Sequence, residues 1–168
     1  MEELFLDILT QLGTMEGISL VDEDYGQLET SEDTYPVTFP AILIETPHVE
    51  WTDMGQLSQL GRVSLRVRLV IDCYHDTHYG STQEEEVASH IRLYNQMHRT
   101  LQGFRPSTAS GLIRETSRFY TIAHGIKCYE SVYSCEVKDV IKDVTVTPVT
   151  IVPAVGVRFE QFGQEDQN

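Results

Sequence analysis

The sequence predicts an α+β protein in which a mainly antiparallel sheet of about four to six strands packs against one long helix and a short N-terminal helix. The first observation is the alternation of apolar and largely polar residues along 62–73, which is typical of a strand with one buried face. The second is a change of period further along the chain, where apolar residues recur at steps of four and three, as on one face of a helix. The third is a pair of β-rich runs, 112–122 and 126–140, separated by the turn Ala123–His124–Gly125.

The chain before the long strand predicts short elements. Residues 2–12 predict a helix that Gly13 ends as a C′ residue, with an apolar stripe made of Leu4, Phe5, Ile8, Leu9 and Leu12. Residues 17–21 predict a short strand, and the acid-rich stretch 22–36 predicts a solvated loop. The apolar run 41–45 lies between prolines and predicts a buried strand. Residues 48–60 predict a connection.

The long strand and the helix after it form the predicted centre of the fold. The expected buried face of the strand consists of Val63, Leu65, Val67, Leu69, Ile71 and Cys73. Ser81 or Thr82 is the expected N-cap of the helix, with Glu84 or Glu85 completing a capping box, and Gly103 is expected to end it. The expected apolar stripe of the helix consists of Val87, Ile91, Tyr94, His98 and Leu101.

The C-terminal part predicts a strand pair and an arm. Tyr129, Tyr133, Cys135 and Val137 share one face of the second strand of the pair. Beyond it the chain is rich in β-branched residues but is interrupted by Pro148 and Pro153, which favours an edge strand or an extended arm. We therefore expect one α+β domain over 1–141, followed by an arm or edge strand over 142–168 with a flexible acidic end. Such an arm is suited to adding to the sheet edge of a neighbour.

Composition excludes several classes of protein. The formal net charge of −14, from 12 basic and 26 acidic residues, argues against a protein that wraps duplex nucleic acid. No run is long and apolar enough to span a bilayer, which takes about 20 residues, so no membrane partner is expected. Three cysteines without a CxxC pair favour reduced core thiols over a disulfide framework.

Two features suggest a contact with another subunit. Arg62, Arg66 and Arg68 fall on the polar face of the long strand, which concentrates positive charge in an acidic chain. Such a face fits either a solvated sheet surface paired with neighbouring acids or an interface for an acidic patch on another subunit. Trp51, the single tryptophan, fits either a binding anchor or a half-buried packing role.

The turn after the long strand holds side chains of the metal-ligand type: Asp72, His75, Asp76 and His78. Their spacing matches no zinc signature, so a polar loop is the expected reading and no metal or cofactor is predicted. The adjacent carboxylates Glu84, Glu85 and Glu86 suit the N-terminus of a helix without any acid–base role. No catalytic residue is predicted.

In the order of its elements the chain resembles the small tail-completion and tail-terminator proteins of tailed phages and prophages, which act in head–tail joining. The resemblance rests on YPVTFPAILIE at 35–45, on the strand 63–74 with the helix GSTQEEEVASHIRLYNQMHRTL, and on the strand pair within 119–137. Together these stretches span residues 35 to 139.

The resemblance implies a structural virion protein without catalytic residues. It implies a homo-oligomeric ring, possibly a hexamer, that completes or terminates the tail tube and meets a tail tube protein and a head–tail connector protein. It places the protein in the virion tail after assembly in the host cytoplasm. Acidic residues would line the lumen, so that DNA passes without specific binding, and the arginines with Trp51 would form the subunit interface.

Two alternatives stay open. A metal-dependent hydrolase would use Asp72, His75, Asp76 and His78, with the three glutamates nearby. A bacterial adaptor domain of non-phage origin would have the same fold without the ring.

Overall fold

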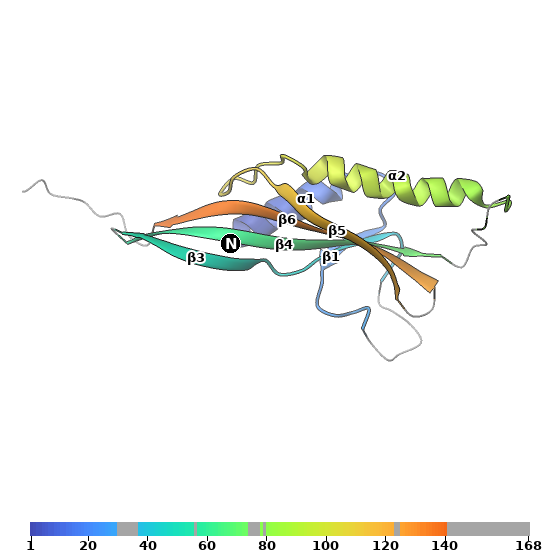
Figure 1. The fold of residues 1–168 in the computed structure, drawn as a ribbon, viewed down its shortest axis with the longest axis horizontal. Coiled ribbons are helices and arrows are strands. Elements are labelled where there is room, and N and C mark those ends of the chain that lie inside the picture. Colours follow the sequence, from blue (N-terminus) through green and yellow to red (C-terminus); the bar gives the residue numbers. More distant parts are fainter. Residues whose placement is uncertain (30–36, 56, 74–77, 79, 123–124, 141–168) are drawn as a thin grey trace, which may run out of the picture.

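The structure is a computed structural model, and it describes residues 1–29, 37–55, 57–73, 78, 80–122 and 125–140. A six-stranded sheet carries two helices on one side (Figure 1). The chain order is α1 (Glu2–Gly13), β1 (Leu20–Glu23), β2 (Ala41–Ile44), β3 (His48–Gly55), β4 (Ser58–Asp72), α2 (Glu84–Leu101), β5 (Ile113–Ile122) and β6 (Ile126–Val140). The α+β fold class predicted from the sequence is confirmed.

The sheet is organised around β4. Along its whole length β4 pairs antiparallel with β6, from Ser58 opposite Val140 to Asp72 opposite Ile126. On its other side β4 pairs with β3 over its first half and with β2 over its second half. The spatial order is β1-β2-β4-β6-β5, with β3 beside β4, and only β1 and β2 run parallel. In the described residues β5 and β1 form the outer edges, and β3 has one unpaired side.

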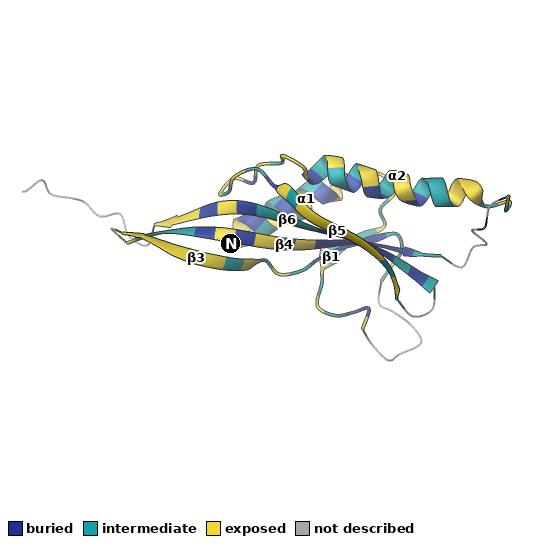
Figure 2. Ribbon diagram, viewed as in Figure 1, coloured by how far each residue is buried: buried dark blue, intermediate teal, exposed yellow. Residues whose placement is uncertain are grey.

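The main core lies between the sheet and the helices (Figure 2). The alternation predicted for the long strand is confirmed, because Val63, Leu65, Val67 and Leu69 are fully buried. Helix α1 buries Leu4, Ile8 and Leu12, as its periodicity predicts. From β6 the same core receives Tyr129, Tyr133, Cys135 and Val137, which confirms the shared face expected for that strand.

A second, smaller core lies on the opposite side of the sheet, which we call the open face. Its buried members are Leu28, Leu43, Val70 and Ile126. Leu28 belongs to the stretch after β1 that was expected to be a solvated acidic loop. Residues 24–29 do form a loop, but Gln27 and Leu28 are buried, so the expectation of a solvated loop is wrong for these two residues. Strand β2 and the second half of β4 carry apolar residues on both faces of the sheet. The loop folds back and covers Leu43 and Val70 on the open face.

Helix α2 differs from its predicted orientation. Its buried residues are His90, Tyr94, Met97 and Leu101, whereas Ile91 is 43% exposed. The buried stripe still follows steps of four and three, but it is rotated so that it includes Met97, which is fully buried. The N-cap is Gln83, one residue beyond the predicted pair, and its side chain makes no cap hydrogen bond. Gly103 adopts φ +78° directly after the helix, as a C′ glycine requires.

Three predicted boundaries are wrong. Residues 48–60 contain strand β3 and the start of β4 instead of a connection. The predicted strand 17–21 is shifted to Leu20–Glu23. Gly13 is the last residue of α1, and Thr14 follows as the C-cap with right-handed backbone angles. For the two strand regions, hydrogen bonding to a neighbouring strand decides the boundary, and local composition does not report that pairing.

The predicted strand pair is confirmed as β5 and β6, whereas Ala123 and His124 of its turn lie outside the described residues. The predicted arm 142–168 also lies outside them, so the domain boundary stays a prediction. Cys128 and Cys135 are buried thiols, and Cys73 is half-buried just after β4. Neither helix of the described chain has the length and hydropathy needed to cross a membrane.

The central role of β4 gives a stability prediction. Leu69 is fully buried in the main core, so Leu69→Ala should lower the free energy of unfolding by about 2–5 kcal/mol. Chemical denaturation followed by circular dichroism measures this change. The matched control is Thr52→Ala on the exposed strand β3, for which we expect less than about 1 kcal/mol. Equal losses in the two variants would contradict the assignment of the buried face.

Candidate interaction surface on the open face of the sheet

The open face carries the three arginines of β4 that were predicted as an interface. They alternate with the buried apolar residues of the same strand, so all three side chains point away from the helices. Their accessibility falls along the strand: the side chain of Arg62 is 68% exposed, that of Arg66 is 44% exposed and that of Arg68 is 9% exposed. The three arginines therefore have different environments.

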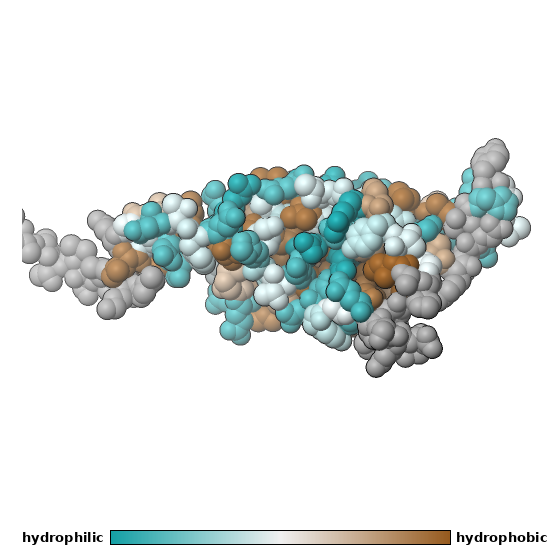
Figure 3. All heavy atoms as spheres, turned by 60° about the horizontal axis from the view of Figure 1, so that its bottom comes forward, coloured by the Kyte–Doolittle hydropathy of each residue, from teal (hydrophilic) through white to brown (hydrophobic). Residues whose placement is uncertain are grey.

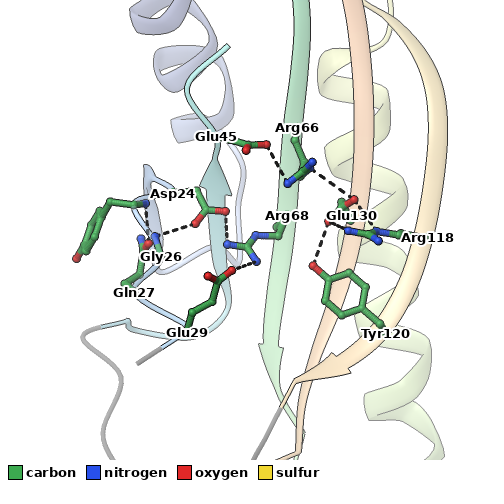
Figure 4. A network of polar contacts seen from close by, with 11 residues as sticks. Asp24, Gly26, Gln27, Glu29, Glu45, Arg66, Arg68, Arg118, Tyr120 and Glu130 are labelled. Atoms are coloured by element: carbon green, nitrogen blue, oxygen red, sulfur yellow. Dashed lines mark hydrogen bonds and ion pairs between the residues drawn. The ribbon is translucent and has the colours of Figure 1, made fainter. Parts of the chain in front are cut away.

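Arg68 forms a nearly buried ion pair with Asp24, whose side chain is 8% exposed. The loop that supplies Asp24 holds itself in place, because the Gly26 N–H donates to the Asp24 carboxylate at 3.3 Å and the Gln27 amide donates to the Glu23 carbonyl at 2.8 Å. Burial is the largest single influence and disfavours the charge of the guanidinium, but the interactions with Asp24 and Tyr120 together outweigh it and raise the pKa of Arg68. This pair fastens the loop to the sheet (Figure 4).

Arg66 belongs to a network that joins four segments of the sheet. It lies 3.1 Å from the carboxylate of Glu45, at the end of β2, and 3.7 Å from that of Glu130 on β6. Arg118 of β5 binds both oxygens of Glu130, at 2.7 and 2.9 Å. The hydroxyl of Tyr120 donates to Glu130 at 3.0 Å, which completes the set of partners around this carboxylate (Figure 4).

Glu130 is the buried centre of this network, with 4% of the residue exposed. Burial disfavours its charge, but the hydrogen bonds from Arg118 and Tyr120 outweigh burial and lower the pKa of Glu130. Burial is also the largest cause that raises the pKa of Tyr120, to about 12. The phenol therefore stays protonated and remains a donor to the carboxylate over the whole physiological range of pH.

Arg62 lies at the accessible end of the open face. It donates to Glu115 at 2.6 Å, and this hydrogen bond, with help from Glu50 and Glu136, raises the pKa of Arg62. Glu50 and Glu136 are its cross-strand partners on β3 and β6. Two shallow depressions of about 360 and 190 Å³ lie against Arg62. Figure 3 shows this side of the molecule as a mixture of hydrophilic and hydrophobic residues.

Trp51 does not lie with the arginines. Trp51 pairs with Gly61, which lies two residues before the core residue Val63 on β4. Residues two apart on a strand share a face, so Trp51 occupies the helix side of the sheet. A Cβ at Gly61 would lie within 2.9 Å of the Trp51 ring and 2.7 Å of Val49, so the ring packs directly over the glycine backbone. Trp51 remains 42% exposed.

The structure thus places the four predicted interface residues on two different faces. On the open face each arginine is matched by at least one carboxylate of the same chain. This geometry corresponds to the interpretation of a sheet surface paired with neighbouring acids. The contact with another subunit stays a prediction, for which Arg62 and Trp51 retain accessible side chains.

The sequence did not reveal the acidic partners of the arginines. Asp24, Glu115 and Glu130 lie in three separate segments, and only the strand register and the loop path bring them to β4. The alternative of a metal-dependent hydrolase falls on the turn after β4. His75 and Asp76 lie outside the described residues, so this alternative stays open. Within the described part of the chain, no three ligand-type side chains gather as a metal ion would need.

Comparisons with known proteins give a match of fold. No protein-family model and no curated protein matches the sequence. Among solved structures, the chain is similar to one from the "virion of native gene transfer agent (GTA) particle", with a TM-score of 0.58 and 10% sequence identity. The match covers 82% of this chain and 96% of that chain. At this identity the similarity shows a common fold.

The network around Glu130 gives a prediction with a defined pH dependence. Because the folded pKa of Glu130 lies below its unfolded value of about 4.3, the carboxylate stabilises the protein above that value. This stabilisation is lost as the pH falls through the folded pKa. Glu130→Gln should therefore lower the free energy of unfolding at pH 7 by about 1–3 kcal/mol.

Urea denaturation of the wild type and the variant between pH 7 and pH 3 checks this prediction. The gap between the two proteins should narrow on acidification. Glu136→Gln, on the exposed end of β6, is the matched control and should cost less than about 1 kcal/mol. A gap that stays constant over the whole pH range would show that the charge of Glu130 does not act through this network.

Proposed function

We propose that this protein is a structural component of the tail of a phage-like particle. It assembles as a homo-oligomeric ring that completes or terminates the tail tube and joins the tube to the head connector. The observation that carries this proposal is the fold shared with a chain of a gene transfer agent virion over 96% of the length of that chain. The resemblance of the sequence to tail-completion and tail-terminator proteins supports the same class independently of the structure.

The exposed strand β5 supports self-association. Its outer side is unpaired in the described residues, and Ile113 and Phe119 on this strand are 60% and 59% exposed. A long edge strand with exposed apolar side chains is a template for contact with another chain unless something covers it. In the proposed ring, a neighbouring subunit or the tail tube protein covers this edge.

The acidic character of the chain fits a ring around DNA. A net charge of −14 gives no basic footprint for phosphates, so DNA moves past such a surface without being held. The arginines of the open face do not change this, because carboxylates of the same chain pair with them. In this proposal the protein acts by assembly rather than by catalysis.

The two alternatives have different discriminating tests. The hydrolase alternative requires stoichiometric metal in untagged protein, which elemental analysis detects, and no observation on the described residues favours it. The adaptor alternative uses the same fold, and the neighbouring genes distinguish it from the phage-like proposal, because a tail protein is encoded among other virion genes.

The oligomeric state tests the proposal most directly. Light scattering behind size exclusion on untagged protein should give a mass several times the 19.1 kDa of the chain. Negative-stain images of that peak should show rings, with six subunits as the expected number. A monomer at all concentrations that also fails to bind purified tail tubes would overturn the proposed function.

Arg62 gives the corresponding test of the predicted interface. Arg62→Glu should weaken assembly, since it replaces an accessible donor with a fourth carboxylate beside Glu50, Glu115 and Glu136. Arg99→Glu, on the exposed side of α2, is the control with the same change of charge. Sedimentation velocity should show a shift toward smaller species for the first variant only. Equal behaviour of both variants would remove Arg62 from the interface.

A further inference from the structure

An apolar patch lies at the tip of the β3–β4 hairpin, outside the site described above. Its residues are 42–57% exposed, and we call them the tip patch: Trp51, Met54 and Leu57. The hairpin and the end of β6 extend beyond both helices (Figure 1), so no element of the described chain covers them. Hydrophobic atoms are visible at this narrow end in Figure 3. Exposed apolar residues that gather at one place mark an interaction site.

The tip also offers a free sheet edge. Strand β3 pairs only with β4 among the described residues, so its outer backbone groups from His48 to Gly55 have no strand partner. A strand that pairs antiparallel with β3 would lie along the tip patch and satisfy these groups. Addition of an extended segment to such an edge is a common mode of peptide recognition.

The chain itself provides a segment of the required type at this place. Val140 is paired with Ser58 at the tip, so the 28 residues 141–168 begin beside the patch. Residues 144–152 read VTVTPVTIV, in which apolar and polar side chains largely alternate. Pro148 and Pro153 lack an N–H and restrict such a strand to the edge of a sheet.

Charge favours the same segment. The protein carries a net charge of −14, and β3 itself contains Glu50 and Asp53. Two copies of an acidic protein repel each other, and this repulsion opposes contacts between their charged surfaces. Residues 144–157 contain no charged side chain. This stretch can approach the acidic tip of another copy at the lowest electrostatic cost.

We propose that residues 144–152 of a second copy of this chain add as an antiparallel strand to β3 and cover the tip patch. The inference rests on the self-association in the proposed function and names its contact. The same copy is less suited as the donor. From β6, a strand beyond β3 lies three strand spacings away, about 14 Å. Residues 141–143 span that distance only when fully extended, at about 3.5 Å per step, which leaves no chain for the reversal of direction.

The single tryptophan makes the contact measurable, because Trp51 is part of the patch. In the full chain, the emission maximum should shift to the blue as concentration rises, in parallel with the mass measured by light scattering. A chain that ends at residue 141 should keep red-shifted emission at all concentrations and should assemble less. Val146→Asp should behave like the truncated chain. Gln164→Asp adds the same charge outside the uncharged stretch and should behave like the wild type.

Cross-linking identifies the donor copy. In a Cys73→Ser background, chains with Thr52→Cys on β3 are mixed with chains with Val146→Cys and treated with a short bis-maleimide. A cross-link between the two kinds of chain is the expected product. A chain that carries both Thr52→Cys and Val146→Cys is treated in the same way for comparison. A link that forms only within this doubly substituted chain would overturn the proposal in favour of docking within one chain. Trp51 emission that is independent of concentration but shifts to the red on truncation would have the same meaning.

Failure of this inference is distinguishable from failure of the proposed function. A full-size ring whose Trp51 emission and mass are unchanged by the truncation would overturn the arm contact and leave the ring intact. A monomer at all concentrations would overturn both.

Discussion

The pairing of β4 with strands on both of its sides is the constraint on which the rest of the structure depends. All fifteen residues of β4 pair with β6, and β2 and β3 share its other side. Because side chains alternate across a strand, this position forces one row toward the helices and the other row away from them. The first row is apolar and forms the core with α1 and α2. The second row contains the arginines, so the fold has to neutralise guanidinium groups on its open face.

The open face meets this requirement with carboxylates from distant segments. The loop after β1 brings Asp24 to Arg68, and β6 brings Glu130 to Arg66 and Arg118. A charge this deeply buried is costly unless it is paired and hydrogen-bonded, which explains why both acids have several partners. The same contacts hold the loop over the small core around Leu28. The polar network is thus part of what closes the sheet, and it neutralises the arginines of the open face.

In the proposed ring, exposed apolar strand edges are the expected surfaces for self-association. The outer side of β5 and the tip of the β3–β4 hairpin both combine unpaired strand edges with exposed apolar residues. In a chain with a net charge of −14, contacts through apolar side chains limit the repulsion that opposes contact between acidic faces. In our proposal, such a protein surrounds DNA without binding it and still holds its neighbours. Its fold is that of a chain from a gene transfer agent virion, and our proposal of a tail-completing ring combines that fold with these edges.

The sequence by itself determined the fold class, the buried face of β4, helix α1 and the strand pair β5–β6, because hydrophobic periodicity is a local property of the chain. It did not determine that residues 48–55 form a strand or which side of α2 is buried, since both depend on a partner element. It also gave the arginines without their partners. Only the tertiary structure decided that Asp24, Glu115 and Glu130 meet them and that Trp51 lies on the opposite side of the sheet. The reason is physical: these contacts depend on strand register and loop path, which bring together residues far apart along the chain.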